Sequence, residues 1–316
     1  PLSRAQKLET YGCGSEVHFH AETGSASGTQ PHLPRVPCQV ERAAGQTVRK
    51  TACPFPEDGL RAAGVAVSSF ALAASTAGPR DLSATAIICL VASAKNSEGT
   101  DRANLDLLGW SSIPFERFKK RVVYVVAPGA VIMPFAPRVD AIVFSSLPGE
   151  MGGAALADVL LGEASPAGHL SVTMPNRMHE TPVRIDRNGD SYAEGFEVGH
   201  RWYQAHNVRP AFAFGWGLSY CSLVHVGSAE LRPPSGGQRP RVSLKLWCDA
   251  AHASRTTGEV DQVVQLYLQH QRPHPRGFKE LAGFGKARNL EAKKQILIDV
   301  EYDPPRTWGS LPGDKK

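Results

Sequence analysis

The chain has 316 residues, of which 42% are hydrophobic and 21% are charged, so most of it is expected to fold as an ordinary globular protein. This length is sufficient for two domains. The formal net charge of +5 is spread along the sequence and no apolar run approaches the length of a membrane span, so we expect neither a nucleic-acid partner nor a membrane partner.

Residues 1–80 form the least regular part of the sequence. They are rich in Gly, Ala, Pro, Ser and Thr, with short apolar runs such as GVAVSSFALAA, and they predict irregular structure with one or two helices. The sequence begins with Pro1 and shows no signal-peptide pattern, so we expect an internal or processed piece of a protein.

Three continuous apolar runs follow, each ending in a turn: ATAIICLVASA (84–94), RVVYVVAPG (121–129) and DAIVFSSLPG (140–149). Runs without alternation are typical of strands that are buried on both faces, as in a parallel sheet covered by helices. Cys89 lies in the first run and is expected to be a small buried hydrophobe.

The segment EMGGAALADVLLG (150–162) predicts a helix after the third run. Its buried stripe would comprise Ala155, Leu156, Val159 and Leu160, and Gly162 would end it. Strands that alternate with helices predict an α/β layer, with any site at the carboxyl ends of the strands.

The stretch YAEGFEVGHRWYQAHNVRPAFAFGWGLSY (192–220) fits neither a helical nor a strand period. It combines many glycines with seven aromatic rings: Phe196, Trp202, Tyr203, Phe212, Phe214, Trp216 and Tyr220. Such a stretch is typical of an irregular path held by buried rings, which either covers a domain or lines a site.

After Tyr220 the runs RVSLKLWCDA, EVDQVVQLYLQHQ, FKELAGFGKA and KQILIDVEY alternate apolar and polar residues. They predict an antiparallel β-sandwich of immunoglobulin or fibronectin type. The expected organisation is therefore an N-terminal part (1–80), an α/β sandwich domain (81–222), an all-β sandwich (223–303) and a tail (304–316).

The motifs of several other protein classes are missing. The six cysteines form no C-x-x-C pair, which argues against a zinc ribbon or a thioredoxin-type site. GWGLS lacks the third glycine of a dinucleotide-binding loop, and no G-x-S-x-G elbow exists. We expect no metal site and no cofactor.

Four groups of motifs together resemble glycoside hydrolase family 3, in the part that follows its catalytic barrel. They are NSEGTDRANLDL (96–107), LPGEMGGAALADVLLGEASPAGHLSVTMPN (147–176), YAEGFEVGHRWY with FAFGWGLSY, and VVQLYL with KELAGFGKARNL. The resemblance covers about residues 81–303 in the order of the family. It implies an α/β sandwich of mostly parallel strands followed by a fibronectin type III-like domain, and residues 1–80 would then belong to the α/β part.

The resemblance implies that the aromatic stretch covers the seam between the two domains. Trp202, Tyr203, Phe212, Phe214 and Trp216 should then be largely buried and should touch both domains. Glu194 and Arg201 are expected to be buried partners, because a buried charge needs pairing. Three positions depart from the family pattern, since His200 stands for its usual tyrosine and Ala213 and Ser171 for prolines. We expect His200 to be a packed substitution.

The resemblance also implies a retaining β-glucosidase-like mechanism with two carboxyl groups. The family's nucleophile is an aspartate on the barrel, usually in an S-D-W setting, and no aspartate of this chain precedes a tryptophan. Glu98 in NSEGTDR matches the general acid/base position, on a loop after the first apolar run. Without a closed cleft, Glu98 should titrate as an ordinary carboxylate, and Asp101 and Arg102 should brace the loop as an ion pair.

The functional hypothesis is the C-terminal part of a β-glucosidase-like hydrolase that acts on terminal β-glycosidic bonds and is inactive alone. Its expected partners are a β-linked oligosaccharide or glucoside and a family 3 barrel, in cis or in trans. Two alternatives remain, a non-catalytic module that binds carbohydrate or stabilises a barrel, and an inactive truncated product. The resemblance allows an extracellular location, but the sequence does not decide the compartment.

Overall fold

The computed structural model of the chain describes residues 2–3, 5, 7–11, 39–41, 49–51, 60, 66–70, 83–92, 102–181, 195, 197–221, 224–249, 260–269, 279–291 and 294–302. The chain divides into two compact units. The first comprises residues 1–161 and 174–178, and the second comprises residues 162–173 and 179–316. The predicted domain boundaries, including the one after residue 222, stay predictions.

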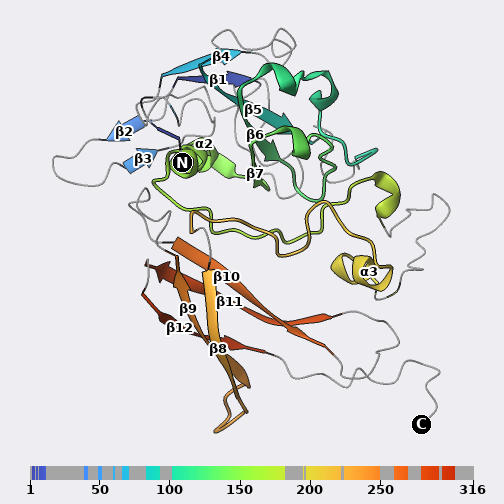
Figure 1. Ribbon diagram of the computed structural model, residues 1–316, viewed down its shortest axis with the longest axis vertical. Helices are drawn as coiled ribbons and strands as arrows, with labels where there is room; N and C mark the ends of the chain where they lie inside the picture. The colour runs from blue at the N-terminus through green and yellow to red at the C-terminus, as the bar shows by residue number, and fades with distance from the viewer. Residues whose placement is uncertain are drawn as a thin grey trace. The chain divides into compact units, whose positions relative to one another are not determined.

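The first unit is built on a five-stranded parallel sheet with the order β4-β1-β5-β6-β7 (Figure 1). Its strands are β1 (Leu8–Tyr11), β4 (Val67–Phe70), β5 (Thr85–Val91), β6 (Lys120–Val126) and β7 (Ala141–Ser145). The three apolar runs are therefore neighbouring parallel strands, as predicted. Two strands come from residues 1–80, where the sequence had indicated irregular structure with one or two helices.

One face of this sheet packs against helix α2 (Gly152–Leu161). The parallel register aligns Ile87 with Val122, so alternate residues of β5 and β6 lie on the same face. They form one core with α2: Leu8, Leu60, Ile87, Cys89, Val122, Tyr124, Val126, Leu156, Ala157, Leu160 and Leu161.

Helix α2 confirms the predicted helix, but its buried stripe is displaced from the predicted one. Leu156 and Leu160 are buried, whereas Ala155 is exposed and Val159 is half-buried. The helix begins with Gly152 and Gly153, both of which are buried together with Ala154, so small residues occupy part of its inner face. Gly162 follows the helix with φ 81°, the left-handed conformation that commonly ends helices.

Aromatic rings form a second buried cluster in the first unit. The Phe115 ring stacks on Phe135 at 5.4 Å between ring centroids, and Tyr11 of β1 meets Phe118 edge-on at 5.3 Å. All four rings are buried, and Tyr11 donates a hydrogen bond of 2.7 Å to the buried Glu9 carboxylate. Short 3-10 turns connect these segments: η2 (Trp110–Ser112), η3 (Phe115–Arg117), η4 (Ala136–Arg138) and η5 (Gly149–Met151).

Two further features of the first unit were not predicted. β2 (Gln39–Glu41) and β3 (Arg49–Thr51) form a separate antiparallel pair. Cys89 is buried as expected, but it takes part in a disulfide and is not a free thiol. A buried cysteine in an apolar strand looks the same in the sequence whether its sulfur is free or bonded, because both forms are small and apolar.

The second unit contains an antiparallel sandwich, as predicted (Figure 1). Its strands are β8 (Val224–Arg232), β9 (Arg241–Cys248), β10 (Val260–Leu268), β11 (Glu280–Leu290) and β12 (Ile296–Glu301). One sheet has the order β12-β9-β8 and the other pairs β10 with β11. Both sheets contribute to one core, which contains Cys221, Leu246, Cys248, Val260, Ala287 and Leu290. The unit also contains α3 (His200–Ala205), and the division between the units falls within η6 (Met178–Glu180), after Met178.

Candidate functional site

The carboxyl ends of β5 and β6 are joined by backbone hydrogen bonds. Ala92, directly after β5, donates to the Val126 carbonyl at 3.1 Å and forms an isolated bridge with Leu107. Leu108 then donates to the Val91 carbonyl at 2.9 Å. The chain therefore leaves β5 at Ala92 and returns to the same end of the strand.

Arg102 connects the segment that returns to the end of β5 with the loop after β6. Its Nη2 donates a hydrogen bond of 3.2 Å to the Ala130 carbonyl, and a Cβ on Gly129 would lie 3.7 Å from this nitrogen. Ile132 also donates to the Leu105 carbonyl at 2.9 Å. The loops after two adjacent strands thus form one connected edge, at the position where ligands bind in open α/β sheets.

Glu98 and Asp101 lie outside the described residues, between Ala92 and Arg102. The role of Glu98 and the ion pair of Asp101 with Arg102 therefore stay predictions. The described contact of Arg102 is with a carbonyl of the neighbouring loop, which the sequence had not indicated. Arginine readily makes such a contact, because its guanidinium offers five donors.

The aromatic stretch meets the sandwich within the second unit. Gln204 of α3 accepts a hydrogen bond from the Lys279 backbone at 2.8 Å, just before β11. His200 stacks on Phe214 at 4.9 Å between centroids and meets Tyr267 of β10 edge-on. The stretch therefore covers part of β10 and the start of β11.

The expected burial of the five rings is correct only for Tyr203. Tyr203 is 6% exposed, Trp202, Phe212 and Phe214 are half-buried, and Trp216 is 50% exposed. Burial raises the pKa of the Tyr203 phenol to about 12, and the Glu180 carboxylate adds to this rise. Tyr203 therefore stays neutral at every pH of practical interest.

The glycines beside Trp216 explain why its ring faces solvent. A Cβ on Gly215 would collide with the Gln265 side chain, and one on Gly217 would lie 2.6 Å from the Gly168 carbonyl oxygen. The backbone between them is fixed, because Leu170 donates to the Trp216 carbonyl at 2.8 Å and Gly215 donates to the Leu170 carbonyl at 2.8 Å. Both glycines face close neighbours, and the tryptophan between them is left on the open side.

His169 joins the same backbone to the sandwich. Its Nδ1 lies 2.6 Å from the Gly215 carbonyl oxygen, so Nδ1 is the donor, and its Nε2 lies 2.8 Å from the Gln262 amide nitrogen. Nε2 then accepts from Gln262, so both ring nitrogens are used in hydrogen bonds.

His200 is a packed residue, as expected. Burial lowers the pKa of its imidazole, the Arg201 charge lowers it further, and a backbone hydrogen bond at Lys279 opposes the shift. The imidazole is therefore neutral near pH 7. Arg201 is half-buried, and its expected partner Glu194 lies outside the described residues.

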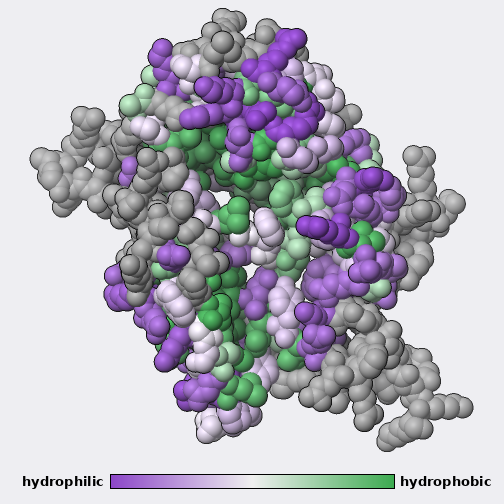
Figure 2. Space-filling model, in the orientation of Figure 1, coloured by the Kyte–Doolittle hydropathy of each residue, from purple (hydrophilic) through white to green (hydrophobic). Residues whose placement is uncertain are grey.

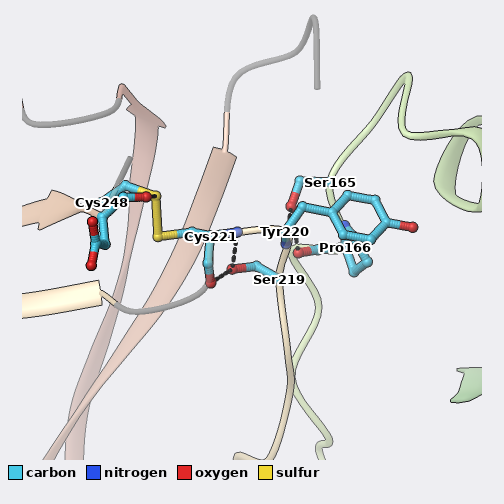
Figure 3. The surroundings of a disulfide bond; sticks show 7 residues. Ser165, Pro166, Ser219, Tyr220, Cys221 and Cys248 are labelled. Atoms are coloured by element: carbon cyan, nitrogen blue, oxygen red, sulfur yellow. Dashed lines mark hydrogen bonds between the residues drawn. A yellow bond between two sulfur atoms is a disulfide. The ribbon is translucent and has the colours of Figure 1, made fainter. Parts of the chain in front are cut away.

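A disulfide joins Cys221 to Cys248 where the aromatic stretch enters the sandwich (Figure 3). Tyr220 donates its backbone N–H to the Ser165 hydroxyl at 3.0 Å, and the Ser219 hydroxyl bonds to both backbone groups of Cys221. Sequence reasoning missed this bond. The sequence places Cys221 shortly before one strand and Cys248 at the end of the next, but only the pairing of β8 with β9 shows that the two residues meet.

Among the described residues, no cluster of histidine, cysteine and acidic side chains could hold a metal ion. No helix in this part of the chain has the length and apolar character needed to cross a membrane.

Comparison with known proteins identifies the family. Residues 1–220 match the glycosyl hydrolase family 3 C-terminal domain. This chain belongs to glycoside hydrolase family 3. It is 32% identical over 248 residues to the β-glucosidase BoGH3A of Bacteroides ovatus, a match that covers 70% of this chain and 32% of that relative. It is 31% identical over 234 residues to an exo-α-(1→6)-L-arabinopyranosidase of Bifidobacterium longum, covering 70% of this chain and 30% of that relative.

Solved structures of family 3 proteins share the fold. A β-glucosidase of Bifidobacterium adolescentis superposes with a TM-score of 0.72 at 24% identity, covering 96% of this chain and 44% of that one. DesR, a β-glucosidase from Streptomyces venezuelae in complex with D-glucose, gives a TM-score of 0.61 at 27% identity, covering 69% of this chain and 28% of that one. The chain spans about a third of the length of the curated relatives it matches.

Proposed function

We propose that this chain is the C-terminal part of a retaining β-glucosidase-like enzyme that hydrolyses terminal β-glycosidic bonds, and that Glu98 is its general acid/base. The observation that most supports the proposal is the position of the two described residues that flank the segment containing Glu98. Ala92 and Arg102, on either side of residues 93–101, are both bonded to the segment that ends β6 and follows it. In α/β sheets, ligands bind at this edge, which is formed by the carboxyl ends of the strands.

The proposed chemistry needs two carboxyl groups about 5–5.5 Å apart. Glu98 would protonate the leaving oxygen and then take a proton from the attacking water. The nucleophile would come from a family 3 barrel, in cis or in trans, because no aspartate of this chain precedes a tryptophan. One carboxylate cannot form the glycosyl intermediate, so the chain alone should be inactive.

The proposed substrate is a glucoside or an oligosaccharide with a terminal β-linked sugar. The names of the relatives include a β-glucosidase and an exo-α-(1→6)-L-arabinopyranosidase. Nitrophenyl β-glucoside is therefore the first test substrate and nitrophenyl α-L-arabinopyranoside the second.

The test compares the chain alone with the chain joined to a family 3 barrel. The chain alone should show no turnover above background, and the joined enzyme should be active. In the joined enzyme, Glu98→Gln should lower the rate by about 10²–10⁴-fold on a substrate with a poor leaving group, which is the usual size of acid catalysis. A dinitrophenyl leaving group needs no proton to depart. Glu98→Gln should therefore change the rate of its release in the first step only a little.

Glu116→Gln is the matched control, because Glu116 is an exposed glutamate of the same unit near the amino end of β6. It should leave the rate unchanged. Turnover by the isolated chain that is abolished by Glu98→Gln would contradict the need for a barrel. Full activity of the joined Glu98→Gln enzyme would reject the acid/base role.

A second candidate is a non-catalytic module that binds carbohydrate or stabilises a barrel. The exposed ring of Trp216, with Phe212 at 6.2 Å between centroids, favours it. A saturable change of tryptophan fluorescence with glucose, lost in Trp216→Ala, would support carbohydrate binding by the isolated chain. A tryptophan fluorescence that does not change with glucose would reject carbohydrate binding by the isolated chain.

A further inference from the structure

Hydrophobic packing contributes little to the attachment of β8. β8 lies at the margin of the order β12-β9-β8 and, within the described residues, pairs only with β9. Its register shifts between Val226 and Ala229, and such an irregularity interrupts the ladder. Val226 is 62% exposed and Leu231 is 65% exposed, and Figure 2 shows hydrophobic surface among the hydrophilic residues of the sandwich.

One end of β8 is held by polar contacts. Arg232 donates from Nε to the Ser243 hydroxyl at 3.0 Å, and this hydroxyl donates to the Asp299 carboxylate at 2.5 Å. Arg232 also pairs with Glu230, but both side chains are largely exposed, and exposed ion pairs contribute little. In the described part of the chain, this end is therefore held by non-covalent contacts alone.

The other end of β8 is held by the disulfide. Val224 pairs in register with Cys248, and Cys221 lies three residues before Val224, so the bond closes the open end of the β8–β9 hairpin. Val224 is also the β8 residue that packs against the sandwich core. Figure 3 shows the bond beside the segment of Ser219 and Tyr220, which continues into the aromatic stretch.

We propose that the Cys221–Cys248 disulfide is the lock that holds β8 to the sandwich, so that the second unit reaches its final structure only in an oxidising compartment. Its formation joins two Sγ atoms, releases two protons and passes two electrons to a disulfide-bearing oxidant, which leaves as a dithiol. Cys221 is 6% exposed and Cys248 is fully buried, so thiol reagents reach the finished bond only slowly, when this end of β8 opens. It is therefore set during folding and persists afterwards.

The inference does not depend on the catalytic role of Glu98, and its first test is chemical. Protein produced by an oxidising secretion route is alkylated under denaturing conditions without reductant and digested for mass spectrometry. A peptide that links Cys221 to Cys248 is expected. Recovery of both cysteines as alkylated thiols would overturn the proposal.

The second test measures how strongly the disulfide protects the amides of β8 from exchange. In Cys221→Ala/Cys248→Ala, the amides of β8 should exchange with deuterium faster by on the order of 10²-fold, as expected from opening a loop of this length. The amides of β5 and β6 should keep their protection. Arg232→Gln is the matched control at the other end of β8 and should change β8 protection much less. Unchanged protection of β8 in the double variant would contradict the proposal that the disulfide holds β8 to the sandwich.

If the double variant does not fold, the intact chain is titrated with dithiothreitol instead. The protection of β8 should then disappear at the concentrations at which the linked peptide disappears. Loss of protection while the linked peptide remains, or full protection after its loss, would reject the proposal.

Discussion

The two units bury their strands in different ways. In the first unit, six of the seven residues of β5 are buried, so this strand is covered on both faces. In the second unit, β10 is buried only at Val260 and half-buried along the rest of its length. The second unit adds specific contacts to its smaller core: the Cys221–Cys248 disulfide, the His169 bridge to Gln262, and close backbone contacts at glycines. Packing therefore dominates in the first unit, which also contains the disulfide-bonded Cys89, whereas specific contacts contribute more in the second.

The greatest loss of stability is expected when a buried ring is removed from the first unit. Phe115 is 0% exposed and stacks on Phe135. Phe115→Ala should lower the free energy of unfolding by about 3–5 kcal/mol, because it leaves a cavity. Urea unfolding followed by circular dichroism measures it. Phe284→Ala, at a 73% exposed ring on β11, is the control and should change stability by no more than about 0.5 kcal/mol.

The second prediction tests the glycine contacts of the second unit. A Cβ on Gly283 of β11 would collide with the Glu301 carbonyl oxygen of β12. Gly283→Ala should therefore destabilise the sandwich by about 1–3 kcal/mol, the usual cost of overpacking. A Cβ on Gly168 meets nothing within 4 Å, so Gly168→Ala is the matched control. Equal melting temperatures for the two variants would show that β11 moves to accommodate the added methyl group without loss of stability.

The third prediction compares how much two rings of the aromatic stretch contribute to stability. Tyr203 is buried, whereas Trp216 is half exposed between two glycines. Tyr203→Ala should lower the melting temperature by several degrees, because loss of a buried aromatic side chain leaves a cavity. Trp216→Ala should lower it by less than half as much. The opposite order in a thermal scan would mean that Trp216 is covered by another part of the protein.

The smallest expected effect is a pH dependence from His200. Its folded-state pKa lies below the usual 6.5, so above pH 6.5 both states are neutral and His200 adds no pH dependence. As the pH falls below 6.5, the unfolded state binds a proton before the folded state does, and stability is lost. Unfolding free energies between pH 7.5 and 5.5 should show this loss. His200→Tyr, which removes the titrating imidazole but keeps an aromatic ring, should reduce the slope of stability against pH. An unchanged slope would assign the pH dependence to other groups.

Much of the fold follows from the sequence alone. Continuous apolar runs predicted β5, β6 and β7 as parallel neighbours, and alternating runs predicted the antiparallel sandwich. The expected burial on both faces is wrong for β7, where Ala141 is exposed and the other residues are half-buried. The other predictions succeeded because the burial of a regular strand repeats with a fixed period, which the sequence records directly. The motifs around Glu98 indicated the family, and the family match confirms it. The position and role of Glu98 itself stay predictions.

Tertiary structure alone decided the rest. The exposure of Trp216 depends on what lies opposite Gly215 and Gly217, and a stretch without a period does not record its neighbours. The pairing of Cys221 with Cys248 is equally hidden, because six cysteines allow many pairings and only the β8–β9 register brings these two together. Arg102 reaches the Ala130 carbonyl because parallel strands end at one edge, so loops distant in sequence meet there.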